Sequence, residues 1–175
     1  MVNRNHREFL IENLKRMEFE SLLEIGCGRG EHLTNIESAF PKKRLVGIDI
    51  DKNKIESAKV CLKNTQLFVK DLLELPFEDK SFDIVLSSAV LFYITPENIR
   101  KALSEMIRVG KNQLIFFEFY SPIEMKIARE NYYARDYEAL LRSFGVENVW
   151  KVKIPTEMWP ALPWKDWGYY IEANL

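Results

Sequence analysis

The sequence has little that could crosslink the chain or anchor it in a membrane. It contains two cysteines in 175 residues, Cys27 and Cys61, too few for a disulfide framework or a cysteine-rich zinc site. The first ten residues include no apolar core of a signal peptide, and no run approaches the roughly 18 apolar residues that a membrane span requires. We therefore expect a soluble, cytoplasmic protein with no membrane partner.

An excess of charge of either sign is also missing. The 25 basic and 26 acidic side chains nearly cancel, so no overall field attracts a nucleic-acid backbone, and the terminal segments are too short and too neutral to form an added RNA-binding domain. The histidines are His6 and His32, and neither has a cysteine or an acid at ligand spacing. We expect no metal site and take His32 to be a solvated helix residue.

What the chain does contain is an alternation of short apolar runs, rich in β-branched residues, with longer segments of helical period. This alternation is typical of a parallel sheet with crossover helices, and 175 residues are about one domain. The predicted strands are residues 21–25, 44–48, 66–70, 82–87, 113–119, 146–154 and 169–173. The predicted helices are residues 7–17, 31–40, 52–62, a helix that starts at Thr95-Pro96-Glu97, and 136–144.

Three glycines follow the first predicted strand, in the segment Glu24-Ile-Gly26-Cys-Gly28-Arg-Gly30. Glycines at such a position adopt positive φ and let backbone amides approach a ligand, while the free N–H groups of the next helix attract a carboxylate or phosphate. A dinucleotide is disfavoured, because G-x-G-x-x-G from Gly26 would need a glycine where Glu31 stands. The segment predicts a small-ligand site, with a plain strand-to-helix turn as the alternative.

This segment resembles motif I of the class I S-adenosylmethionine-dependent methyltransferases, of the methyltransferase type 11 kind. Three further blocks similar to that family follow in its order, at residues 45–50, 70–72 and 75–88. The resemblance covers about the whole chain after residue 20. It implies one α/β, Rossmann-like domain over residues 1–175, with a mostly parallel seven-stranded sheet, an antiparallel last strand and helices on both faces. Residues 1–20 would supply a leading helix and a candidate lid.

The resemblance implies S-adenosylmethionine as the cofactor and S-adenosylhomocysteine as the product. Asp49, at a strand end, can accept hydrogen bonds from both ribose hydroxyls; its alternative role is a helix cap, for which Asp51 is better placed. Glu24 would hold the cofactor ammonium or, alternatively, anchor a loop. The predicted cofactor-binding residues are Glu24, Gly26, Cys27, Gly28, Gly30, Asp49, Ile50, Asp71, Leu72, Ser87 and Ser88.

Three residues of that set are expected to contact the adenine of S-adenosylmethionine. In the family an acid such as Asp71 takes the adenine amino group, and a solvated loop acid is the alternative. Ile50 and Leu72 would sandwich the ring through apolar contacts, with ordinary core positions as the alternative.

Methyl transfer asks little of the protein, because the sulfonium already makes the methyl group electrophilic. For a weak nucleophile, a general base adds roughly 10²- to 10⁴-fold. Candidates for that base are Tyr93, Glu118 and His6. Glu118 interrupts an apolar run, where an acid is costly unless it is hydrogen-bonded, so a role as an interior anchor stands beside the catalytic one.

Aromatic residues gather in the loops that, in this family, open on the cofactor side. We predict that they enclose a small, partly apolar or planar acceptor, with loop packing as the alternative. The candidate acceptor-pocket residues are Tyr93, Tyr132, Tyr133, Trp159 and Trp164.

The sequence thus predicts a methyltransferase acting on a small-molecule acceptor. After the fourth strand it reads Ser87-Ser-Ala-Val rather than the Asn-Pro-Pro-Tyr of many amino-group methyltransferases, which disfavours that type of nitrogen acceptor. The alternatives are an RNA- or protein-modifying methyltransferase that works with a partner subunit, and a non-catalytic interaction module of the same fold.

Overall fold

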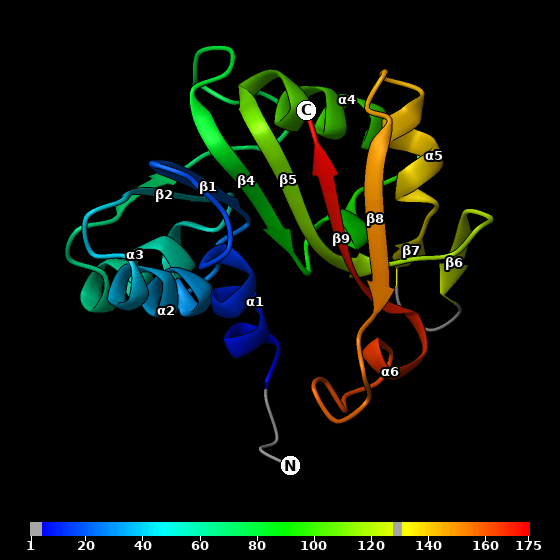
Figure 1. Cartoon of the computed structure of the whole chain (residues 1–175), viewed down its shortest axis with the longest axis horizontal. Coiled ribbons are helices and arrows are strands. Elements are labelled where there is room, and N and C mark those ends of the chain that lie inside the picture. The colour runs from blue at the N-terminus through cyan, green and yellow to red at the C-terminus, as the bar shows by residue number, and fades with distance from the viewer. Residues whose placement is uncertain (1–4, 128–130) are drawn as a thin grey trace.

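A seven-stranded sheet in the order β3-β2-β1-β4-β5-β9-β8 forms the middle of the protein (Figure 1). The structure, a computed structural model, describes residues 5–127 and 131–175. The strands of this sheet are β1 (Ser21–Ile25), β2 (Arg44–Asp49), β3 (Gln66–Val69), β4 (Phe82–Ser88), β5 (Gly110–Phe119), β8 (Asn148–Lys153) and β9 (Gly168–Asn174). The helices are α1 (His6–Leu14), α2 (Glu31–Ala39), α3 (Lys52–Cys61), α4 (Ile99–Val109), α5 (Tyr137–Arg142) and α6 (Trp164–Trp167), with a 3₁₀ turn, η1 (Leu91–Tyr93).

The pairing confirms the predicted topology. Strands β3, β2, β1, β4 and β5 are parallel, whereas β9 runs antiparallel to both β5 and β8. Every residue of β4 is buried, as is typical of a central parallel strand covered by helices on both faces.

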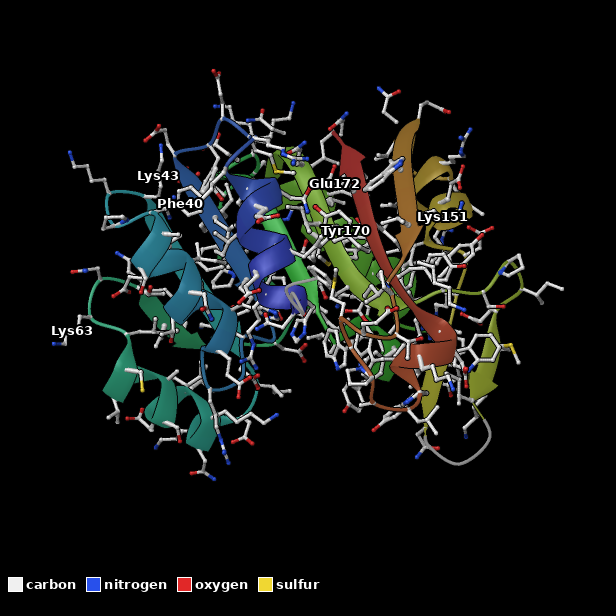
Figure 2. All side chains as sticks on the ribbon, turned by 60° about the horizontal axis from the view of Figure 1, so that its bottom comes forward. Phe40, Lys43, Lys63, Lys151, Tyr170 and Glu172 are labelled. Atoms are coloured by element: carbon white, nitrogen blue, oxygen red, sulfur yellow. The ribbon has the colours of Figure 1, made fainter. Side chains whose placement is uncertain are left out.

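Two hydrophobic cores lie on opposite faces of the sheet. On one face α1, α2 and α3 pack through Leu14, Leu33 and Ile55. On the other, α4 and α5 pack through Leu103 and Leu141. Figure 2 shows α1 lying across the first face between α2 and β9, where the Phe9 ring contacts Tyr170 with centroids 5.0 Å apart. No helix in the described parts of the chain is long and apolar enough to cross a membrane.

Several element boundaries differ from the sequence prediction: β5 begins at Gly110 instead of Gln113, β8 is shorter by two residues at its start, and α5 ends at Arg142 instead of Phe144. Two other helices differ as well. The helix expected from Thr95 begins at Ile99, because the Thr95 carbonyl accepts hydrogen bonds from the amides of Asn98 and Ile99 and closes a turn first. The leading helix ends at Leu14 instead of Met17.

Four elements were not predicted: η1, α6, and the strands β6 (Met125–Ile127) and β7 (Tyr132–Ala134), which pair as a hairpin. Each is three or four residues long, which is too short for a periodic pattern to register.

A buried carboxylate joins the starts of two central strands. Asp83 in β4 accepts hydrogen bonds from the backbone amides of Glu20 and Ser21 at 2.8 and 3.0 Å and from the Ser21 hydroxyl at 3.0 Å. Burial alone would raise the pKa of Asp83, but these hydrogen bonds outweigh it and leave the pKa below its ordinary value. The ionised carboxylate therefore stabilises the entry to β1.

We expect Asp83→Asn to lower the free energy of unfolding by about 1–3 kcal/mol, because the neutral amide oxygen is a weaker acceptor than the ionised carboxylate oxygen that takes all three bonds. The measurement is urea denaturation at pH 7. Asp79→Asn is the matched control: Asp79 is an exposed acid in an ion pair with Arg108, and its loss should stay within about 0.5 kcal/mol. Equal losses in the two variants would contradict the role given to Asp83.

Candidate functional site

The glycine segment forms a tight loop between β1 and α2. Gly26 and Gly28 have φ values of 64° and 57°, the left-handed region that favours glycine. A Cβ on Gly26 would lie 2.3 Å from the Val90 side chain, so only glycine lets the turn after β4 approach this closely. A Cβ on Gly28 would meet no atom within 4 Å, so at this point the loop faces open space.

Asp49 fastens this loop to the neighbouring strand. One of its carboxylate oxygens accepts from the amide of Gly28 and the other from the amide of Asp51, both at 2.9 Å. Asp51 itself caps α3, as the sequence predicted. Because a carboxylate can accept about four hydrogen bonds, Asp49 keeps acceptor capacity beyond these two.

A cavity of about 490 Å³ opens beside the loop, at the carboxyl ends of β1 and β4. We call it the glycine-loop cavity. Its other walls come from α1, the start of α2 and the loop after β8. It is lined by His6, Arg7, Glu24, Gly26, Cys27, Gly28, Arg29, Glu31, His32, Lys54, Ser88, Ala89 and Trp159.

His32 is not solvated, contrary to the expectation from the sequence. It is 9% exposed, its ring stacks on Phe117 at an interplanar angle of 17°, and its Nδ1 lies 3.0 Å from Oε1 of Glu24. Helical spacing could have revealed this burial, since His32 stands four residues before Ile36, a core residue on the same face of α2.

His6 closes the cavity from the side of α1. Its ring stacks on Trp159 with centroids 3.7 Å apart, and the neighbouring Arg7 forms an ion pair with Glu31. Burial, with added repulsion from His32 and Arg7, lowers the pKa of His6 to about 3. His6 is therefore a neutral imidazole near pH 7.

The predicted cofactor residues are brought together only in part. Five line the glycine-loop cavity: Glu24, Gly26, Cys27, Gly28 and Ser88. The other six do not: Gly30, Asp49, Ile50, Asp71, Leu72 and Ser87.

The six lie in different surroundings. Asp49 touches the cavity loop through Gly28, and Ile50 beside it is 72% exposed. Asp71 is exposed and accepts from the amide of Leu73, while Leu72 is buried in the core on the α4 face.

Glu118 is a fully buried anchor for the turn that follows β4. It accepts hydrogen bonds from the Ser87 hydroxyl and from the amides of Val90, Leu91 and Phe92, at 2.8 to 3.2 Å. Burial raises the pKa of Glu118 to about 7, although these hydrogen bonds oppose the change.

The opposite side of the same turn is held by Arg135, also fully buried. Its guanidinium donates to the carbonyls of Leu91 and Ile94 and pairs with Glu124. A buried acid and a buried guanidinium thus fix the segment 90–94, which carries Tyr93.

The predicted acceptor aromatics form one group, with one member apart. The hydroxyls of Tyr93 and Tyr132 lie 3.5 Å apart, and Trp159 stacks on the buried Trp164 with centroids separated by 3.8 Å. Phe92 contacts Tyr93, Tyr132 and Trp164 and connects the two pairs. Tyr133 lies against the Arg135 guanidinium instead.

Residues 23–117 match the family described as "Methyltransferase domain", which is more than half of the chain. The chain belongs to the class I S-adenosylmethionine-dependent methyltransferase family.

Two curated relatives of this methyltransferase chain act on different acceptors. A tRNA (carboxymethyluridine(34)-5-O)-methyltransferase from Arabidopsis thaliana is 36% identical over 92 residues, which are 51% of this chain and 21% of that protein. A demethylmenaquinone methyltransferase from Thermotoga maritima is 26% identical over 118 residues, which are 66% of this chain and 51% of that protein. The chain therefore spans about half the length of the second relative and about a fifth of the first.

Solved structures share the methyltransferase fold. A chain in the complex between the Haloferax volcanii Trm112 methyltransferase activator and a methyltransferase superposes with a TM-score of 0.71 at 18% identity. The superposition covers 94% of this chain and 87% of that chain. At this identity the likeness shows the fold alone.

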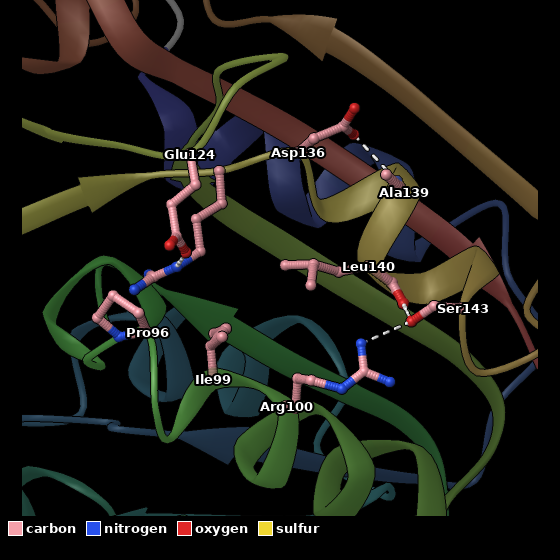
Figure 3. A pocket seen from close by; sticks show the side chains of 9 residues that line it. Pro96, Ile99, Arg100, Glu124, Asp136, Ala139, Leu140 and Ser143 are labelled. Carbon is pink, nitrogen blue, oxygen red and sulfur yellow. Dashed lines mark hydrogen bonds and ion pairs between the residues drawn. The ribbon is translucent and has the colours of Figure 1, made fainter.

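A second cavity, of about 390 Å³, lies between the start of α4 and α5, away from the glycine loop of the methyltransferase motif (Figure 3). Its polar side chains are paired with one another: Arg135 with Glu124, Arg100 with the Ser143 hydroxyl, and Asp136 with the amide of Ala139. None of the predicted site residues lines it.

In the described parts of the chain, no three acidic, histidine or cysteine side chains are grouped to hold a metal ion.

The raised pKa of Glu118 predicts a pH dependence of stability. The ordinary value is 4.5 and the folded value about 7, so the folded state binds the proton more tightly. This contribution is complete below about pH 4.5 and is lost as the pH rises through about 7. Between pH 5 and pH 8, wild-type protein should lose about 2–3 kcal/mol relative to Glu118→Gln, which cannot titrate.

Urea denaturation of both proteins at the two pH values tests this dependence. Because all other titratable groups are shared, their effects cancel in the comparison. Parallel pH profiles would show that Glu118 has the same pKa in the folded and unfolded states.

Proposed function

We propose that this chain is an S-adenosylmethionine-dependent methyltransferase whose cofactor binds in the glycine-loop cavity. The observation that carries the proposal is the cavity itself, which lies where the chain order of the parallel sheet reverses between β1 and β4. In open α/β sheets, ligands bind at such switch points, outside the carboxyl ends of the strands.

The residues of the cavity fit this cofactor. Glu24 is 2% exposed and its Oε2 has no hydrogen-bond partner among the described residues, so a buried acceptor faces a place for an ammonium group. The open space at Gly28 leaves room for close backbone approach. Asp49, beside the loop, retains acceptor capacity for the hydroxyls of a ribose.

When bound, the cofactor supplies a methyl group already activated by its sulfonium, so the chain's task is to orient the reactants and exclude water. The ion pair of Arg7 with Glu31 and the stacking of His6 on Trp159 join α1, α2 and the loop after β8 over the cavity. This arrangement supports the lid assigned to residues 1–20. His6 is neutral but, with a pKa of about 3, a weak base. His6 would therefore add little as a general base.

A small, partly apolar acceptor is favoured by the aromatic group next to the cavity. Trp159 lines the cavity and stacks on Trp164, which is joined through Phe92 to Tyr93 and Tyr132. Aromatic walls of this kind bind planar or apolar molecules. The likeness to a demethylmenaquinone methyltransferase agrees with such an acceptor.

A tRNA methyltransferase that works with a partner subunit is the second candidate. It is favoured by the likeness to the Arabidopsis tRNA methyltransferase and by the structural neighbour that forms a complex with Trm112. Transfer of labelled methyl to bulk tRNA only when such an activator is added would select this candidate over the small-molecule one.

Both candidate functions require that the chain bind S-adenosylmethionine, and calorimetric titration of cofactor-free protein tests this binding. S-adenosylmethionine and S-adenosylhomocysteine should bind, and NAD, the control, should not. If neither S-adenosylmethionine nor S-adenosylhomocysteine binds to the folded protein, the catalytic proposal fails and a non-catalytic module is favoured.

Asp49→Ala should lose most of the affinity for S-adenosylhomocysteine, about 10- to 100-fold, because hydrogen bonds to a charged group contribute about 1.5–3 kcal/mol. The fold should persist, with a moderate loss of stability because the amides of Gly28 and Asp51 lose their acceptor. Calorimetry gives the affinity and circular dichroism checks the fold. Unchanged affinity would show that the ribose is held elsewhere.

A further inference from the structure

We propose that the outer edge of β8 is an interaction surface for a second copy of this chain. β8 is the last strand of the seven-stranded sheet, so one side of its backbone pairs with β9 and the other side pairs with no strand in the described residues. In the proposed dimer the two β8 strands lie antiparallel about a twofold axis and join the two sheets.

The backbone of β8 presents hydrogen-bonding groups along this edge. In an antiparallel pair, opposed residues alternate between hydrogen-bonded and non-bonded pairs. The amide of Ile154 donates to the carbonyl of Gly168 at 3.0 Å, so the even-numbered residues of β8 are the ones bonded to β9. The odd-numbered residues Val149, Lys151 and Lys153 therefore turn their backbone groups outward. The amide of Val149 already donates within the chain, which leaves the other two amides and all three carbonyls for a second strand.

Apolar side chains stand uncovered on one face of this edge. Trp150 and Val152 are 53% and 38% exposed, and they share the face of the sheet that carries Tyr170. Figure 2 shows α1 on the α2 side of β9, so β8 lies beyond the cover that this helix gives to the face. Neighbouring exposed apolar side chains on an edge strand mark a surface that another strand can cover.

The charges of the edge decide which strand can pair with it, because lysine on an edge strand usually keeps a second strand away. Lys151 is already neutralised, since its Nζ forms an ion pair with Glu138 of α5 and lies 4.9 Å from the centre of the Tyr120 ring. Lys153 is exposed and forms no ion pair within residues 5–127 and 131–175. A strand that pairs with β8 must therefore bring an acid to Lys153.

The chain itself supplies that acid when two copies are opposed. In a twofold pairing centred on Trp150, Lys153 of each copy lies opposite Glu147 of the other, and Glu147 is exposed. Opposite charges at directly opposed positions stabilise an antiparallel pair. The same register brings the two Trp150 rings together and sets each Lys151 amide opposite a Val149 carbonyl. This charge complementarity identifies the occupant as a second copy.

Other twofold registers fit less well, because opposed residues must share a face of the sheet. A pairing centred on Lys151 sets that lysine against itself, and like charges directly opposed are destabilising. A pairing centred on Val149 sets Glu147 against Lys151, which Glu138 already holds, and leaves Lys153 without an acid. Trp150 is therefore the centre of the proposed interface.

Sedimentation equilibrium of the full chain tests the dimer. We expect a reversible dimer with a Kd of about 1–100 μM, because a single strand pair lies at the low end of interface sizes. Trp150→Ala should weaken the dimer about 10- to 100-fold, since it removes the largest side chain at the centre of the interface. Circular dichroism should show an unchanged fold, because Trp150 is half exposed.

Two charge reversals test the register. Lys153→Glu opposes two acids and Glu147→Lys opposes two lysines across the axis, so each variant alone should weaken the dimer about 10- to 100-fold. An equimolar mixture of the two variants should dimerise like the wild type, because each contact in the mixed dimer again joins opposite charges. Lys63→Glu, near β3 at the other end of the sheet, is the matched control and should leave the Kd unchanged (Figure 2).

A wild-type chain that stays monomeric at these concentrations overturns the inference. A dimer that Trp150→Ala and the charge reversals leave intact overturns it as well, since that dimer uses another surface. If both charge variants are folded and their mixture stays monomeric, the pairing centred on Trp150 is wrong. The proposed function neither requires nor excludes the dimer, so the titration with S-adenosylmethionine is interpreted separately.

Discussion

The reversal of chain order between β1 and β4 is the constraint on which the rest of the structure depends. The chain builds outward from β1 through β2 to β3, and then returns to place β4 on the other side of β1. The connections that leave the carboxyl ends of these two strands must diverge, and the opening between them cannot be filled by either. The glycine loop, the approach of Gly26 to Val90 and the cavity all lie at this one opening.

Buried charge in this protein falls into two groups with different physical roles. Glu118 and Asp83 each accept several hydrogen bonds, and Arg135 donates to two carbonyls and pairs with Glu124, so these charges hold backbone in place. Glu24 is different, since only one of its oxygens is bonded. A fully satisfied buried group stabilises local structure, whereas a partly satisfied one needs a further explanation, which a ligand in the glycine-loop cavity would supply for Glu24.

The two walls of the glycine-loop cavity differ in how firmly they are held. The turn after β4 is clamped between Glu118 and Arg135, so the side chains that it carries toward the aromatic group start from a rigid backbone. The other wall of the cavity is made by α1 and the loop around Trp159, which meet through ring stacking, and a surface ion pair joins α1 to α2. Such contacts are weaker than buried hydrogen bonds, so any opening for a ligand is expected on this side.

The sequence by itself determined the seven strands of the main sheet, its two-sided burial and the loop at Gly26 and Gly28, because apolar periodicity and glycine spacing are local properties of the chain. Only the tertiary structure decided which side chains meet. His32 was assigned to solvent from its local surroundings, yet it meets Glu24 because α2 folds back over β1. In the same way, only the register of β1 against β4 and the path of the glycine loop decided that Glu24, Gly26, Gly28 and Ser88 line one cavity.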